Sequence, residues 1–172
     1  KKGIIDGYII EGMYFQQFYF LDKTWITTQI KQNLDVEEIK WRAFIGGFAF
    51  GNPPFSKAIY ELMYPHYEKV INSHFESKDF YENGIIRHIV AFYFWGYEDL
   101  NENHLIKKFL NISKPNLISE LIRFVWMQED YYETLQGDEK IKVEKLVLEL
   151  WQYILNKYKD SKLAEEKKIL HV

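Results

Sequence analysis

Cysteine is absent from the 172 residues, and its absence excludes three kinds of chemistry at once. The chain has no disulfide, no thiolate zinc site and no cysteine nucleophile. Arginine is scarce, occurring only as Arg42, Arg87 and Arg123, and the net charge is -3. Domains that bind nucleic acid usually carry a basic face or stripe. The composition therefore gives no reason to expect a nucleic-acid partner.

Long apolar runs are missing as well. The longest, residues 43–51 and 89–97, are about half of the ~20 residues that a helix needs to cross a bilayer. No secretory signal is visible in the first residues. We therefore expect a cytoplasmic protein with no membrane partner. Because Lys1-Lys2-Gly3 leads directly into apolar sequence without a Met, we also expect the chain to be part of a longer protein.

The common motifs of catalysis do not occur. The sequence lacks Gly-x-Ser-x-Gly, a phosphate-binding loop, His-Glu-x-x-His and the Glu-x-x-His of di-iron bundles. Arg87 and His88 are adjacent, so on a helix they point about 100° apart and cannot converge on one phosphate. We expect no metal, no cofactor and no catalytic residue. Structural or solvated roles are favoured for the scattered histidines, which are His66, His74, His88, His104 and His171.

Aromatic residues are abundant, with 13 Tyr, 13 Phe and 5 Trp among the 172 residues. Such rings fill the gaps between crossing helices. Apolar residues recur at helical rather than strand spacing, and polar residues or proline mark the starts of helices. The pattern predicts helices over 4–21 (whose glycines indicate either the close approach of a neighbouring helix or a break near Gly12), 25–33 (capped by Asp22 or Thr24), 36–51 (capped by Asp35), 57–72 (capped by Ser56), 79–95, 102–111 (capped by Asn101), 115 to near 137, and 138–158.

The stretch from Trp41 to Tyr67 is the clearest unit. An apolar helix stops at Pro53-Pro54, which cannot continue it, and an amphipathic helix begins almost at once. Gly47 and Gly51 in the first helix predict the close approach of a neighbouring helix or of the returning chain. Pro65 lies inside the second helix and predicts a kink or a short restart near Tyr64.

Similar helix pairs are expected on either side of this unit. Four pairs of irregular length fit an all-α, HEAT-like α-solenoid, whose repeats are ~40–47 residues long. A single orthogonal helical bundle would give the same local pattern and remains the alternative. No flexible linker divides the chain, so we expect one all-helical domain over residues 1–172.

The central stretch also resembles a known class of proteins. Trp41, Phe44 and Gly47, the turn at 52–54, and then Leu62, Tyr64 and Pro65 resemble the helical C-terminal regions of large multidomain bacterial proteins. In those proteins a sirtuin-like or NTPase effector precedes an α-helical array, and several act in phage defence. The resemblance implies a non-catalytic sensing or scaffolding region and carries no catalytic residue to any position here.

The aromatic surplus supplies the candidate partner contacts. Not every ring in 93–97 can face one core, and Tyr and Trp are enriched at interfaces. Tyr131 and Tyr132 lie among carboxylates near a helix end, where like charges are mildly unfavourable. We expect protein–protein interaction, through Tyr93, Tyr97, Tyr131 and Tyr132, with a protein partner or with other domains of the same chain. The alternative is a small-ligand-binding or enzymatic helical domain with an aromatic pocket.

Overall fold

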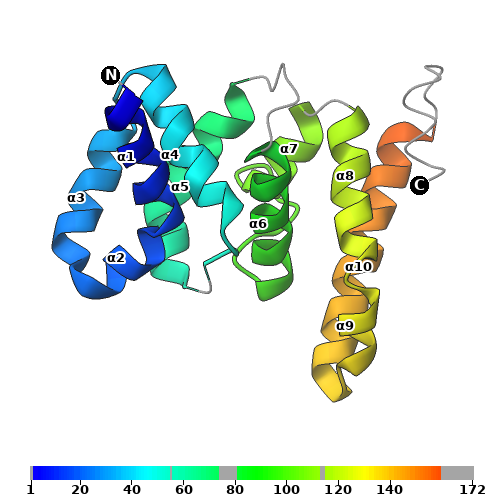
Figure 1. Cartoon of the computed structure of the whole chain (residues 1–172). Helices are drawn as coiled ribbons and strands as arrows, with labels where there is room; N and C mark the ends of the chain where they lie inside the picture. Colours follow the sequence, from blue (N-terminus) through cyan, green and yellow to red (C-terminus); the bar gives the residue numbers. More distant parts are fainter. Residues whose placement is uncertain (1, 55, 74–80, 113–114, 160–172) are drawn as a thin grey trace. The chain divides into compact units, whose positions relative to one another are not determined.

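The computed structural model describes residues 2–54, 56–73, 81–112 and 115–159, and within these ranges the chain is helical with no strand. The expected all-α class is therefore confirmed. The helices of Figure 1 are α1 (Lys2–Met13), α2 (Phe15–Leu21), α3 (Lys23–Asn33), α4 (Glu38–Phe50), α5 (Lys57–Asn72), α6 (Tyr81–Trp95), α7 (Leu105–Ile112), α8 (Pro115–Trp126), α9 (Glu129–Thr134) and α10 (Gly137–Tyr158).

The chain divides into two compact units, and the single domain expected over residues 1–172 stays a prediction. Unit 1 covers Lys1–His88 and unit 2 covers Ile89–Val172, so the division falls inside α6. None of the helices in the described ranges is long and apolar enough to cross a membrane.

Glycines bring the backbones of unit 1 into direct contact. A Cβ atom built on Gly47 of α4 would lie 2.1 Å from the carbonyl oxygen of Ile9 in α1. One built on Gly12 of α1 would lie 2.1 Å from the carbonyl oxygen of Phe44 in α4. Gly84 of α6 meets Ala49 of α4 in the same way, at 2.0 Å. The expectation of close approach is confirmed at Gly47. It fails at Gly51, which ends α4 and where a Cβ would make only an ordinary 3.5 Å contact.

Two of the expected helix starts are confirmed by side-chain hydrogen bonds. Asp22 accepts from the backbone N–H of Trp25 at 2.9 Å, and Ser56 accepts from that of Ile59 at 3.4 Å. Each side chain satisfies an N–H group that has no partner within its own helix. The proline pair ends α4 as expected, since that helix stops at Phe50.

Other expected boundaries were wrong. Glu37 rather than Asp35 precedes α4. Asn101 does not cap α7; instead, the buried carboxylate of Glu98 accepts from the N–H of Ile106 at 3.1 Å. Glu98 lies seven residues before α7, and the turn between them folds over so that its carboxylate reaches the first turn of the helix. The local sequence does not indicate this contact.

Two of the expected helices are each divided into two. The expected 4–21 helix breaks at Tyr14 between α1 and α2, and the expected 115–137 helix ends at Trp126 before the short α9. Conversely, α5 continues through Pro65 without a restart. The start of the expected 79–95 helix lies outside the described residues.

The core of unit 2 is held to α10 by hydrogen bonds as well as by apolar packing. Tyr93 of α6 donates its hydroxyl to the carbonyl oxygen of Leu146 at 3.0 Å. The ammonium of Lys157 donates to the carbonyl oxygens of Leu110 and Asn111 at the end of α7. These bonds tie α6 and α7 to the face of α10 that carries Leu150, Ile154 and Tyr158, which are buried. Leu150 and Ile154 on this face also lie beside residues of α8.

Candidate functional site

Two histidines that the sequence leaves unassigned are fully used by the fold of unit 1. The Nδ1 atom of His66 accepts a hydrogen bond from the indole N–H of Trp41 at 3.3 Å, and its Nε2–H donates to the carbonyl oxygen of Ile30 at 2.9 Å. Because Trp can only donate and a carbonyl can only accept, these partners fix the neutral Nε2–H tautomer. Burial lowers the pKa of His66 to about 4.

His88 repeats this arrangement one helix later. Its Nε2–H donates to the carbonyl oxygen of Gly51 at 3.1 Å, and its Nδ1 accepts from the hydroxyl of Tyr67 at 2.9 Å. Burial lowers the pKa of His88 to about 4 and keeps the pKa of Tyr67 well above its usual value. In both cases a neutral histidine forms two hydrogen bonds. It accepts one from an aromatic side chain one helix earlier in the chain and donates the other to a carbonyl oxygen at the end of the helix two places earlier. Neither imidazole is available as a catalytic base or a metal ligand.

His104 lies in the turn before α7 rather than in a reactive cleft. Its Nδ1 is 3.6 Å from the carboxylate of Glu98, and its Nε2 is 3.5 Å from that of Asp99. The backbone N–H of Asp99 donates to the same ring at 3.3 Å. Within the described ranges no group of three or more His, Asp or Glu side chains is placed to hold a metal ion. This cluster orders the turn and caps α7.

Of the four candidate tyrosines, Tyr93 and Tyr97 belong to packed surfaces. Tyr93 is 1% exposed, so in this fold its ring is not accessible to a partner. Tyr97 is half-buried and stacks on Phe92 with ring centroids 6.2 Å apart. The structure does not bring these two rings together at an exposed site.

Tyr131 and Tyr132 of α9 lie at a more accessible place. Tyr131 is exposed, and its ring centroid is 6.1 Å from that of Tyr132. Tyr132 packs against Phe94 of α6 at 5.4 Å, and its hydroxyl is buried with no hydrogen-bond partner in the described residues. Burial raises the pKa of Tyr132, so its hydroxyl stays protonated and remains a donor. Tyr132, whose hydroxyl has no hydrogen-bond partner in the described residues, lines a cleft beside α10.

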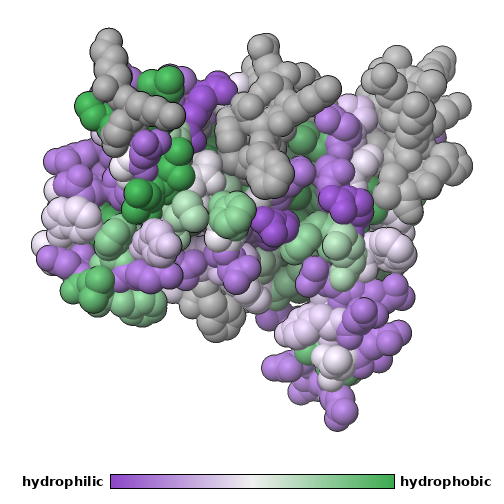
Figure 2. Space-filling view, viewed as in Figure 1, coloured by the Kyte–Doolittle hydropathy of each residue, from purple (hydrophilic) through white to green (hydrophobic). Residues whose placement is uncertain are grey.

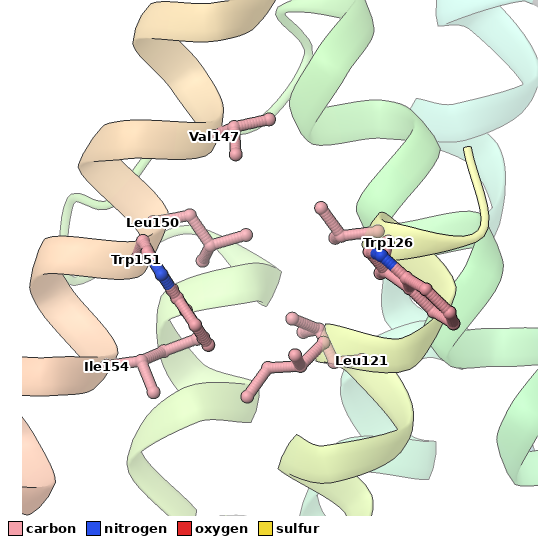
Figure 3. Close-up of a pocket in the computed structure, with 8 residues that line it drawn as sticks. Leu121, Trp126, Val147, Leu150, Trp151 and Ile154 are labelled. Carbon is pink, nitrogen blue, oxygen red and sulfur yellow. The ribbon is translucent and has the colours of Figure 1, made fainter. Parts of the chain in front are cut away.

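An apolar groove of about 230 Å³ runs between α8 and α10 (Figure 3). Leu150, Trp151 and Ile154 project into it from α10, and Leu121 projects from α8 on the opposite side. The indole of Trp126 at the end of α8 is 70% exposed, and Trp151 is 36% exposed. Large aromatic side chains left open beside an apolar floor are typical of binding surfaces.

A second cleft, of about 450 Å³, lies between α9 and α10 and shares Val147 and Trp151 with the first. We call the two together the α10 groove. The second cleft adds an apolar strip at Leu148 and a charged rim formed by Glu129, Glu133, Glu144 and Lys140. In Figure 2 the end of unit 2 where α9 and the start of α10 lie is mostly hydrophilic, in keeping with this rim. The α10 groove is therefore apolar at its α8 end and charged at its α9 end.

Unit 1 carries a hollow of its own, of about 300 Å³, lined by Tyr8, Phe18 and Trp25. Its carboxylate, Glu11, already accepts a hydrogen bond from Asn33 at 2.9 Å. This hollow is lined mainly by apolar and aromatic side chains.

The sequence did not single out Trp126 and Trp151. The available signal was a second apolar stripe on α10, formed by Ile141, Leu148 and Leu155 at intervals of seven residues, all of which are exposed. One helix carrying two apolar stripes has more apolar surface than one neighbour can cover.

Comparison of the chain with protein-family models, with curated proteins and with solved structures gives no match.

Proposed function

We propose that the chain is a non-catalytic protein-binding domain and that its binding surface is the α10 groove of unit 2. The observation that carries this proposal is the pair of exposed tryptophans, Trp126 and Trp151, which line an apolar groove. Interface hot spots are enriched in Trp and Tyr set among apolar neighbours. The partner is a protein or another domain of the same polypeptide.

The size and lining of the α8–α10 stretch favour a macromolecular partner over a small ligand, whereas the α9–α10 stretch, at about 450 Å³, has the size of a small-molecule pocket. Pockets for small molecules are usually ~300–1,000 Å³ and bring a few polar groups together over an apolar wall. The α8–α10 stretch is smaller, at about 230 Å³, and it is lined by apolar and tryptophan side chains.

We further infer that the helices form a HEAT-like repeat array within a larger bacterial protein, with a sensing or scaffolding role in defence. The repeated histidine arrangement supports an array, because α3–α4–α5 and α4–α5–α6 are joined by the same pattern of hydrogen bonds one helix apart. Stacked repeats reuse one set of contacts between neighbours. The bacterial and defence parts of the inference rest on the resemblance of the central stretch alone.

A peptide-library selection on the immobilised chain tests the binding function. Selected peptides are expected to bind the wild type and to lose at least about tenfold in affinity on Trp126→Ala/Trp151→Ala, since aromatic hot spots contribute about 2 kcal/mol or more. Phe20→Ala, which removes an even more exposed ring from unit 1, should leave binding unchanged. Selection of no peptide, or of peptides indifferent to both tryptophans, would rule the groove out.

A further inference from the structure

The charges around the α10 groove indicate which kind of protein segment it accepts. Glu129 and Glu133 of α9 face the cleft together with Glu144 of α10, and Lys140 is the basic residue among the described lining residues. None of these four side chains forms an ion pair within the described part of the chain. Three unpaired carboxylates against one ammonium leave a local excess of negative charge.

This acidic rim is continuous with the apolar floor rather than separate from it. Val147 and Trp151 line both stretches of the groove, so a single bound segment can touch carboxylates at one end and the tryptophan floor at the other. A lysine or arginine side chain also gains from lying over an indole face. Charged rims of this kind raise the association rate of a partner of opposite sign.

The walls of the groove also restrict the conformation of the partner. They are built from α8, α9 and α10 and present no strand edge for a bound segment to pair with. Any backbone group that the segment buries on the apolar part of the groove must therefore be satisfied within the segment itself. An α-helix does so, and an amphipathic helix laid in a groove is a common mode of recognition.

We propose that the α10 groove binds a basic amphipathic helix of a protein partner, with aliphatic side chains on the α8–α10 floor and lysine or arginine against Glu129, Glu133 and Glu144. This inference rests on the proposed binding function and adds the chemistry of the partner to it. From Lys140 to Ile154 the groove follows 14 helical steps of α10, about 21 Å at 1.5 Å per residue. A partner helix of roughly 18 residues would cover that length.

Three synthetic helices of about 18 residues serve as probes. One carries a leucine stripe with lysine at its polar positions, the second has the same stripe with glutamate, and the third has lysine with alanine in place of leucine. Fluorescence anisotropy measures their affinity for the full chain at low and at physiological salt. The leucine–lysine helix is expected to bind at least about tenfold more tightly than either of the others, and to weaken as salt rises.

Variants locate the effect. Glu129→Gln/Glu133→Gln/Glu144→Gln should abolish the preference for lysine over glutamate, whereas Asp6→Asn/Glu37→Gln/Glu61→Gln, which removes three exposed carboxylates from unit 1, should not. Trp151→Ala should weaken the leucine–lysine helix. All of these positions are at least one-third exposed, so the folded state is expected to persist, and circular dichroism checks it.

The remaining outcomes separate the two proposals. If both leucine helices bind equally and both need Trp151, the binding function stands and the basic partner is excluded. If the alanine–lysine helix binds as well as the leucine–lysine helix, the attraction is non-specific charge and the inference fails. If no helix binds, or binding ignores Trp126 and Trp151, both proposals are overturned.

Discussion

At single positions, the packing of unit 1 depends on glycines that allow two helix backbones to touch. Gly46 and Gly47 are neighbours in α4, but they face different surroundings. A Cβ at Gly47 would collide with the backbone of Ile9, whereas one at Gly46 would meet nothing within 4 Å. Substituting each glycine with alanine therefore distinguishes two effects on stability, the close packing of helices at Gly47 and the general cost of a glycine inside a helix at Gly46.

Gly47→Ala is therefore expected to lower the free energy of unfolding by about 3 kcal/mol or more, because a backbone atom cannot give way as a flexible side chain can. Gly46→Ala should instead raise it by up to about 1 kcal/mol, the usual gain from replacing glycine inside a helix. Urea unfolding of both variants measures the difference. Equal effects of the two substitutions would show that α1 and α4 are not in backbone contact.

The two buried histidines make stability depend on pH. An imidazole in the unfolded chain has a pKa near 6.5, while His66 and His88 have pKa values of about 4 in the fold. Between these values the unfolded state binds more protons, so stability is fully present above pH 6.5 and is lost as the pH falls towards 4. Each histidine accounts for a loss of up to about 3 kcal/mol. Glu11, whose pKa burial raises, acts in the opposite direction.

Urea unfolding at pH 7, 6, 5 and 4 measures this loss. His88→Gln should make the free energy of unfolding depend less steeply on pH. Nuclear magnetic resonance titration of the imidazole signals provides an independent reading in the folded wild type. A free energy of unfolding that stays constant from pH 7 to pH 4.5 would contradict the buried neutral pair.

At the scale of helices, α5 contains a proline that the helix does not need. Pro65 is exposed and lies within the helix Lys57–Asn72, where it removes one backbone N–H and crowds the preceding turn. Pro65→Ala is expected to raise the free energy of unfolding by about 2 kcal/mol, after allowance for the greater freedom of the unfolded chain. Pro53→Ala, outside any helix, should give no such gain. Thermal and urea unfolding compare the two variants, and a Pro65→Ala protein no more stable than Pro53→Ala would contradict this explanation.

The sequence predicts the existence of most of these helices but not their neighbours. Asp22 and Ser56 are local signals, and their caps form as expected. The break after Trp126 has no such signal, because Met127-Gln128 contains neither glycine nor proline. In α10 the buried stripe through Leu150 and Ile154 and the exposed stripe through Leu148 use the same residue types. Which stripe is covered depends on the positions of α6, α7 and α8, which periodicity alone does not contain.

The same limit explains the outcome at the candidate tyrosines. The aromatic surplus drew attention to Tyr131 and Tyr132; Tyr132 lines the α10 groove and Tyr131 is its neighbour, and their role as partner contacts stays a prediction. It equally drew attention to Tyr93, which is buried against α10. Adjacent aromatic residues in one helix face different directions, and only the packed structure shows which direction leads to the core.

At the scale of the whole molecule, the two units should respond differently to acid. Among the described residues, both fully buried histidines belong to unit 1, whereas His104 of unit 2 is about one-third exposed. Hydrogen exchange, corrected for its intrinsic pH dependence, should show α3, α4 and α5 losing protection between pH 7 and pH 4.5 before α7, α8 and α10. Equal losses in both units would mean that the histidine pair does not control acid stability.

The five tryptophans allow the proposed binding surface to be located in one measurement. Their indole N–H signals report on the hollow of unit 1 (Trp25), the core (Trp41), the end of α6 (Trp95) and the α10 groove (Trp126 and Trp151). A ¹⁵N spectrum is recorded while a peptide selected on the chain is added, with each signal assigned by Trp→Phe substitution. We expect the signals of Trp126 and Trp151 to move in proportion to occupancy while those of Trp25 and Trp41 stay in place. Movement of Trp25 with unchanged Trp126 and Trp151 would contradict binding in the α10 groove.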